Sequence, residues 1–435
     1  MPDKIFGLRA TTVACLFYFL CSGLIYSQIM GRMPALKEQA GVDPTGVGIA
    51  LLSLGVGSLV GFVTIGITTR YVQSKTLLKL STLLFLLILA ALTMVPNLFL
   101  LCACFALSGF AFSWMEVAAN TQALNLEIFF KRAYISSMHA TFCVGALVGS
   151  LIASGFAFSG LPLFINFISV VILIFIAFFF LGQKLINDQS NEESADTENA
   201  TATAAEQQAS SETTAKDEAD SVHTYRLNDE RLHNPKVEIT EQKRKPRDRI
   251  PLFVIFCGFL TMCTYCGEGT VAEWGGLLLT MAKGASEGEA ALAYGIFSLF
   301  MAIARFCGDP LKKLLGDFKL LFFGTLLGIC CELVVITSSN PYVCIAAFAI
   351  MGIGLSPVMP MILRRAGRYP GIRPALASTV ISTLGYSGML ILPPSLGYVA
   401  SHFGLEAAFL IPLTCIIIVC LGSFAFREKK APVTA

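Results

Sequence analysis

The chain has 435 residues, of which 55% are hydrophobic and only 14% are charged, and its 31 basic and 29 acidic residues leave a net charge of +2. A soluble protein carries about 25% charged residues, so an ordinary soluble domain is excluded, and the near-neutral balance gives no reason to expect a nucleic-acid partner. The apolar residues come in blocks of about 20, enough for a helix to cross a hydrocarbon core of about 30 Å. We therefore expect an all-α integral membrane protein.

The apolar blocks predict twelve membrane-spanning helices in chain order. The first six begin near Ala10, Thr45, Thr76, Leu98, Ala133 and Leu163. The other six begin near Ile250, Ala290, Lys319, Tyr342, Pro374 and Glu406. The first block is interpreted as an uncleaved helix and not a signal peptide, because it is too long and many further spans follow it.

A polar segment separates the sixth predicted span from the seventh. It has almost no large apolar residues over most of its length and ends in the basic cluster "KRKPRDR". Such a composition cannot bury enough surface to offset chain entropy, so we expect it to be disordered. The expected organisation is a six-helix bundle at residues 1–183, a linker at 184–249, a second six-helix bundle at 250–427 and a tail at 428–435.

The distribution of lysine and arginine predicts the orientation. When the loops are numbered alternately, one set includes Arg9, the basic end of the linker and Arg427, whereas the other set holds only Arg32, Lys37 and Lys283. Translocated loops are poor in positive charge. Both termini and the linker are therefore expected to be cytoplasmic, in a multi-pass protein of the inner (cytoplasmic) membrane, and Arg32 is expected to be an exposed loop residue on the other side.

The two predicted halves carry related loops after their second spans. "GITTRYVQSK" follows the second span and "RFCGDPLKKLLGDFK" follows the eighth. The second loop is similar to the signature loop of the major facilitator superfamily, and the residues that fill its pattern are Gly308, Asp309, Lys312, Lys313 and Gly316. The resemblance covers everything except the linker. It implies two pseudo-symmetric six-helix halves, with a central cavity lined by the first, fourth, seventh and tenth helices.

Within that superfamily, "MEVAANTQALNLE" and "HATFCVGALVG" resemble the fucose-permease-like branch and its bacterial relatives of unassigned substrate. In fucose-type symporters an acid of the fourth helix is tied to proton coupling, and Glu116 stands at the matching place. Those proteins also use an acid in the first helix, where this chain offers only Tyr26 and Gln28. The Gly-Pro pattern of drug–proton antiporters is absent from the fifth helix, which disfavours an efflux pump.

Two ionisable residues are predicted to serve proton coupling. An ionised group inside the bilayer costs about 2.5–3.5 kcal/mol on insertion scales, so such residues usually face a cavity or a partner. Glu116 lies inside the fourth span, with Asn120 one turn further on the same face. His139 lies early in the fifth span, where it could relay protons or pair with Glu116. The alternative for each is a group that only hydrogen-bonds to a neighbouring helix.

The predicted substrate-binding residues are polar or aromatic residues within the spans. They are Tyr26, Gln28, Asn120, Gln122, Glu268, Trp274 and Tyr386. Trp274 is equally compatible with an interfacial anchor. A cytoplasmic gate is predicted at Arg305, Gly308, Asp309, Lys312 and Gly316. The paired glycines and prolines of "MGIGLSPVMPMI" in the tenth span predict a bend, because proline removes a helical hydrogen bond. Glu332 is expected to make a hydrogen bond between helices.

These features predict a secondary active transporter that moves a small polar, sugar-like solute by alternating access, with proton-coupled symport. The alternative is a proton-coupled exporter of drugs or metabolites. An enzyme is not expected, because no catalytic cluster gathers at either membrane face, and a sensor is disfavoured because the linker carries no folded output domain. No nucleotide-binding loop, cofactor or metal site is predicted. The expected partners are the solute, protons and the bilayer, and the protein is expected to be a monomer.

Overall fold

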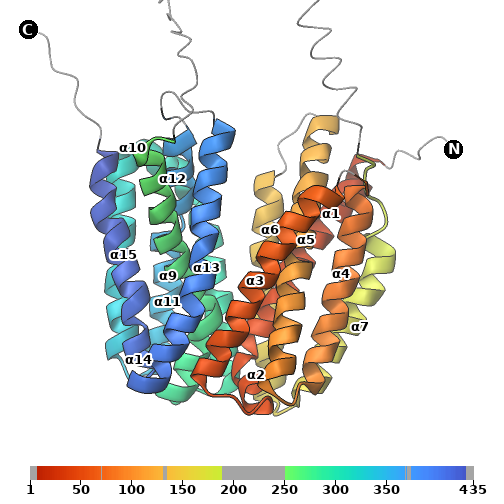
Figure 1. Ribbon diagram of the computed structural model, residues 1–435, viewed down its shortest axis with the longest axis horizontal. Helices are drawn as coiled ribbons and strands as arrows, with labels where there is room; N and C mark the ends of the chain where they lie inside the picture. The colour runs from red at the N-terminus through yellow and green to blue at the C-terminus, as the bar shows by residue number, and fades with distance from the viewer. Residues whose placement is uncertain are drawn as a thin grey trace, which may run out of the picture. The chain divides into compact units, whose positions relative to one another are not determined.

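The computed structural model describes residues 7–69, 71–130, 135–188, 250–367, 369 and 374–427. Within these ranges all regular structure is helical (Figure 1). The helices of the first half are α1 (Leu8–Gly31), α2 (Met33–Gln39), α3 (Pro44–Thr68), α4 (Ser74–Ala91), α5 (Leu98–Phe130), α6 (Ile135–Phe158) and α7 (Leu163–Leu181). Those of the second half are α9 (Leu252–Ala282), α10 (Glu287–Thr337), α11 (Pro341–Leu355), α12 (Val358–Gly367), α13 (Pro374–Phe403), α14 (Leu405–Ala408) and α15 (Leu410–Gly422).

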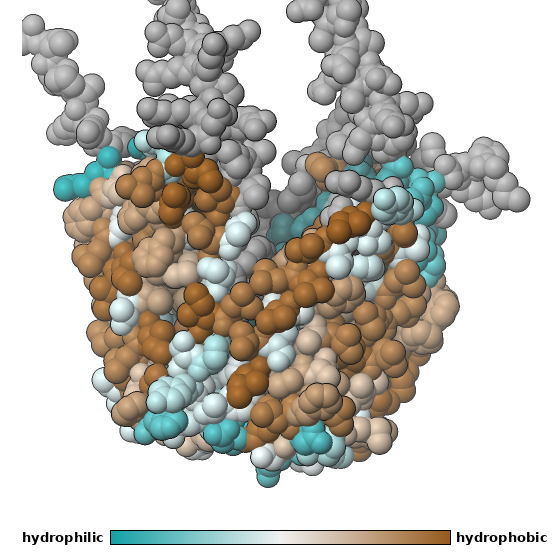
Figure 2. Space-filling view, in the orientation of Figure 1, coloured by the Kyte–Doolittle hydropathy of each residue, from teal (hydrophilic) through white to brown (hydrophobic). Residues whose placement is uncertain are grey.

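The predicted spans are confirmed to within a few residues. The described residues contain eleven helical segments that are long and apolar enough to cross a membrane. The remaining predicted span corresponds to α13, a helix of 30 residues that begins at Pro374 as expected. Figure 2 shows a broad apolar band on one face, with hydrophilic residues gathered at its two ends. The protein is therefore an all-α membrane protein with two six-span halves, and residues 189–249 of the predicted linker lie outside the described residues.

Two of the long helical stretches are interrupted where the sequence carries glycine or proline. The helix α10 contains two spans, and Gly316 between them adopts φ 76° and ψ 167°, a conformation that a residue with a side chain rarely adopts. The predicted bend of the tenth span is also confirmed, because α11 ends at Leu355 and α12 begins only at Val358. Pro357 stands in the break between them.

Close helix packing within the first half depends on glycine. A Cβ atom built on Gly57 of α3 would lie 1.8 Å from the backbone oxygen of Ala106 in α5, and one built on Gly145 of α6 would lie 2.1 Å from the backbone oxygen of Leu20 in α1. No larger residue fits these positions without moving a backbone. Small residues allow the close backbone approach that stabilises helix pairs in lipid.

The two halves contact each other mainly near one end of the bundle. We call this the α2 end, and we call the opposite end, where α1 begins, the Leu8 end (Figure 1). The two halves of the chain, on either side of the linker, form a single compact unit. The helix pairs α3–α13 and α6–α10 make the main contacts between them. At the α2 end the hydroxyl of Thr45 donates to that of Ser401 at 2.7 Å. A Cβ built on Gly295 of α10 would lie 2.5 Å from the Cβ of Ser150 in α6.

Candidate functional site

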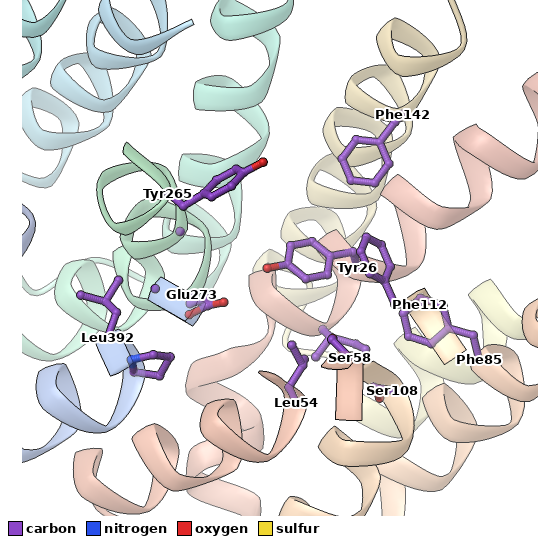
Figure 3. A pocket seen from close by; sticks show the side chains of 14 residues that line it. Tyr26, Leu54, Ser58, Phe85, Ser108, Phe112, Phe142, Tyr265, Glu273 and Leu392 are labelled. Carbon is purple, nitrogen blue, oxygen red and sulfur yellow. The ribbon is translucent and has the colours of Figure 1, made fainter. Parts of the chain in front are cut away.

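A pocket lies between the two halves, on the Leu8 side of these contacts (Figure 3). Its volume, counted as the space that the centre of a water molecule can occupy, is about 190 Å³. The first half lines it with Tyr26, Ile29, Leu54, Ser58, Phe85, Ser108, Phe112 and Phe142. The second half lines it with Tyr265, Gly269, Glu273, Gly388, Leu392 and Pro393. A concave, mainly apolar pocket with a few polar groups is the usual form of a small-molecule site.

Aromatic rings form the wall contributed by the first half. The ring of Phe112 lies 5.5 Å from that of Tyr26, 6.2 Å from that of Phe85 and 6.4 Å from that of Phe142, measured between centroids. These rings come from four different helices, and their spacing is that of stabilising aromatic pairs. The wall is therefore a continuous aromatic surface that spans the interior of the first half.

The principal charged group faces this wall from α9. Figure 3 shows the carboxylate of Glu273 and the hydroxyl of Tyr26 pointing toward each other across the pocket. Glu273 is only 6% exposed, and no hydrogen bond or ion pair joins it to another residue within the described ranges. Ser108 places a second unsatisfied group at the pocket, a buried hydroxyl with no hydrogen-bond partner among the described atoms. The described lining thus presents one carboxyl group and four hydroxyl groups, those of Tyr26, Ser58, Ser108 and Tyr265.

The helical period explains why three residues of α9 reach the pocket together. Tyr265, Gly269 and Glu273 are spaced four residues apart, so they lie along one face of the helix. The small Gly269 leaves room between the two larger side chains, and a Cβ built on it meets nothing within 4 Å. This stripe is not among the residues predicted from the sequence. Its signal in the sequence is a single acid that follows a glycine and a tyrosine at four-residue spacing.

Of the predicted substrate-binding residues whose side chains the structure describes, only Tyr26 lines the pocket. Gln28 is fully buried and joins three helices, since its amide nitrogen donates to the backbone oxygen of Gly149 at 2.7 Å and its amide oxygen accepts from Asn166 at 2.9 Å. Gln122 is also fully buried, and it donates to Ser74 and to the backbone oxygen of Ile186. Both glutamines therefore connect helices and do not reach the pocket.

The other predicted binding residues lie apart from the pocket or outside the described side chains. Trp274 is fully buried, so it is not an interfacial anchor, and it does not line the pocket. Glu268 lies 3.8 Å from Arg305 in an ion pair between α9 and α10. Asn120 is half-buried in α5 and does not line the pocket. The side chain of Tyr386 lies outside the described residues.

The two residues predicted for proton coupling do not meet at the pocket. Glu116 is half-buried in α5, and no described residue forms a hydrogen bond or ion pair with it. His139 is exposed, and its ring packs edge-on against Phe19 at 5.5 Å. Neither residue lines the pocket. The assignment of coupling to these two residues stays a prediction.

The predicted gate is described only in part. Arg305 is paired with Glu268, as above, and Gly316 supplies the backbone turn between the two spans of α10. Gly308 lies within α10, and the side chains of Asp309 and Lys312 lie outside the described residues. The hydrogen bond expected for Glu332 is not found within the described part of the chain, where both of its buried carboxylate oxygens lack a partner.

An ion pair at the α2 end joins the two halves. A guanidinium nitrogen of Arg32 lies 3.3 Å from a carboxylate oxygen of Glu287. Arg32 is only 4% exposed, which corrects the expectation of an exposed loop residue. Burial lowers the pKa of its guanidinium, and the Glu287 carboxylate partly opposes that shift. A second pair, between Lys283 and Glu406 at 3.0 Å, lies within the second half.

Two membrane-spanning halves that enclose a pocket between them define a polytopic transporter. The chain belongs to the Major Facilitator Superfamily, which matches residues 15–274 and 258–435. The expectation from the signature loop is thus confirmed at the level of the superfamily. The described residues contain no group of three histidine, cysteine or acidic side chains placed to hold a metal ion.

Similar proteins cover almost the whole chain. It is 24% identical to an uncharacterized MFS-type transporter of Yersinia pestis, over 90% of this chain and 89% of that protein. It is also 24% identical to the membrane protein MosC of Rhizobium meliloti, over 98% of this chain and 92% of that protein. The fold resembles that of the nucleoside transporter NupG, with a TM-score of 0.68 and 12% identity over 97% of this chain and 100% of that chain. It also resembles a bacterial homologue of the human lysosomal transporter Spinster in an inward-facing, unoccupied conformation, with a TM-score of 0.67 and 12% identity over 99% of this chain and 100% of that chain.

Proposed function

We propose that the protein is a proton-coupled secondary transporter of a small solute in the cytoplasmic membrane. The observation that carries this proposal is the Glu273 carboxyl group, which lies in the pocket between the halves without a partner among the described residues. A buried carboxylate without a counter-charge is costly. A proton or a bound solute removes that cost, so the occupancy of the site and its protonation are linked.

The contacts between the halves support alternating access. They gather at the α2 end, where Arg32 meets Glu287 and Thr45 meets Ser401. The distribution of positive charge places the Leu8 end in the cytoplasm. On that assignment the pocket in this structure is closed toward the outside. Transport then requires these contacts to break and the halves to close at the Leu8 end, a rigid-body movement common in transporters of this class.

The charge of the solute decides the direction of coupling at such a site. An uncharged solute binds beside the protonated acid, so proton and solute travel together, which is the symport predicted for a sugar-like solute. A cation binds the ionised acid in place of the proton, so the two travel in opposite directions, which is the alternative of a proton-coupled exporter. The first route, with Glu116 as the coupling acid, is the prediction made from the sequence resemblance to the fucose-permease-like branch.

The test is a proteoliposome assay under an imposed pH gradient, with internal pH followed by a dye while a panel of solutes is added. We expect solute-dependent proton movement in the wild type and its loss in Glu273→Gln. Glu332→Gln is the matched control, because Glu332 is a buried, unpartnered acid of the same half that does not line the pocket. Loss in Glu116→Gln with retention in Glu273→Gln would move the coupling acid to Glu116. Solute movement without proton flux in the wild type would refute proton coupling.

A further inference from the structure

We propose that the pocket binds an organic cation, such as a protonated amine or a quaternary ammonium ion on an aromatic or aliphatic body, with its positive charge between Glu273 and the aromatic wall. This assignment rests on the proposed function and names the substrate class of the same site. It follows from three properties of the pocket: the sign of its charge, its ring surfaces and its small number of other polar groups.

The charge of the pocket favours a positive ligand. Among the residues that the structure describes, Glu273 is the one charged side chain that lines it, and none of the lining residues is a lysine, arginine or histidine. Three basic residues elsewhere in the described spans and their ends are already paired, Arg32 with Glu287, Lys283 with Glu406 and Arg305 with Glu268. An anionic ligand would meet an unscreened carboxylate in a region of low dielectric constant, where repulsion between like charges is strong.

The aromatic wall supplies a second attraction for a cation. The ring of Tyr26 stands opposite Glu273, and Tyr265 stands beside it on α9 (Figure 3). The face of an aromatic ring attracts an ammonium ion within about 6 Å, and the attraction grows when water is excluded. Tyr26 is held in place by ring contacts with Phe112 at 5.5 Å and Tyr294 at 6.0 Å. A cation beside Glu273 would therefore meet the negative charge on one side and, where it lies over the face of Tyr26 and not at its hydroxyl, a fixed ring on the other.

The other residues that line the pocket indicate how polar the rest of the ligand is. Beyond Glu273, the polar side chains of the described lining are the hydroxyl residues Tyr26, Ser58, Ser108 and Tyr265, which suit at most a few further polar atoms of the ligand. Aliphatic residues such as Ile29, Leu54 and Leu392 line other parts of the pocket, and a ligand rich in hydroxyl groups would leave several of them unpaired against this surface, at a cost. The favoured ligand thus has one positive charge, at most a few other polar groups and an apolar body.

This assignment makes the transporter an exchanger of protons for cations. A monovalent cation and a proton each neutralise the Glu273 carboxylate, and they cannot occupy it together. Exchange of one for the other moves no net charge. A proton gradient directed into the cell then drives the cation outward. The affinity for the cation falls as the pH is lowered, because protons compete for the same oxygen atoms.

The experiment measures equilibrium binding to the purified full-length protein by isothermal titration. The probes are benzyltrimethylammonium and tetraethylammonium, the uncharged isostere neopentylbenzene, and the anion phenylacetate. We expect the cations alone to bind, more weakly at lower pH. We expect Glu273→Gln to weaken their binding about tenfold or more, and Tyr26→Leu to weaken it while Tyr26→Phe retains it. Glu332→Gln should bind like the wild type. Retained thermal unfolding transitions would show that each variant is folded.

Failure of this inference is distinguishable from failure of the proposed function. If neither cation binds, or if wild type and Glu273→Gln bind them equally, the cation assignment is wrong. Proton flux driven by an uncharged solute and lost in Glu273→Gln would then leave the proposed function standing with a neutral substrate. Absence of proton flux with every solute would refute the proposed function, whatever the binding results.

Discussion

Arg32 and Glu287 form an ion pair 3.3 Å long that connects the two halves of the transporter at the α2 end. They are far apart in the sequence, and each lies at the edge of a span: Arg32 directly follows α1 and Glu287 begins α10. The pair exists only while the halves are closed at this end. It therefore stabilises one of the two states that alternating access requires.

Loss of this ion pair is expected to shift the transporter toward the state that is open at the α2 end. Breaking a fully buried ion pair costs about 3–5 kcal/mol. The Glu287 side chain is 36% exposed, so we expect a smaller cost of about 1.4 kcal/mol, which corresponds to a tenfold change in population. Arg32→Gln should increase the population of the longer distance between labels at Glu38 and His402 by about that factor. The distances are measured by electron–electron resonance, with labels attached through unnatural amino acids because the chain has 14 cysteines.

The control for this prediction is Lys283→Gln. It breaks the other ion pair at this end, with Glu406, which lies within the second half. That variant should lower thermal stability without changing the distance between the halves. An unchanged distance distribution in Arg32→Gln would show that the pair does not hold the closed state.

The buried position of Arg32 predicts a pH dependence for a lysine substitution. Burial lowers the pKa of the guanidinium, and Glu287 partly offsets this shift. The reference pKa of arginine is above about 12, so Arg32 stays charged, whereas the reference pKa of lysine is about 10.4. A base is charged below its pKa, so the ion pair of an Arg32→Lys variant is present at neutral pH and lost as the pH rises. We expect the distance distribution of Arg32→Lys to match the wild type at about pH 7 and to broaden by about pH 9.5, with no such change in the wild type.

The helix contact between α6 and α10 predicts a second way to open the α2 end. A Cβ on Gly295 would lie 2.5 Å from the Cβ of Ser150 across the interface between the halves. Gly295→Ala should therefore separate the halves here without disrupting the packing inside either one. The same distance measurement should report a larger open population. Gly155→Ala on α6 is the control, because a Cβ at that position meets nothing within 4 Å, and a similar shift in both variants would contradict the steric explanation.

The spans could be predicted from the sequence because hydropathy alone determines them. Helices α5 and α7 begin at Leu98 and Leu163, the predicted residues. In lipid every backbone group must be satisfied within the segment, so a long apolar block can form little other than a helix. The short helix α2 was missed because its seven residues, "MPALKEQ", mix charged and apolar side chains and are too few to span.

The site was harder to predict because polarity inside a span does not reveal which way a side chain faces. Their polarity within spans predicts Gln28 and Gln122 as substrate ligands, yet both bond to neighbouring helices. Glu268 was selected ahead of Glu273, although five residues on a helix correspond to a rotation of about 140°, so the two acids face different surroundings. One sequence does not show that the face of Tyr265 and Glu273 meets the other half, since that depends on how the halves pack.

The interhelical role of Gln28 gives a last prediction, which separates stability from binding. Its amide bonds to the backbone oxygen of Gly149 and to Asn166, so Gln28→Ala removes two buried hydrogen bonds and leaves the amide nitrogen of Asn166 without its acceptor. The expected cost is about 1–3 kcal/mol of stability, seen as a lower thermal unfolding temperature in detergent. Cation affinity should not change, because Gln28 does not line the pocket. Tyr26→Leu should show the opposite pattern, with weaker binding and a smaller loss of stability. If Gln28→Ala instead keeps the wild-type stability and loses cation binding, Gln28 binds the substrate, as the sequence predicts.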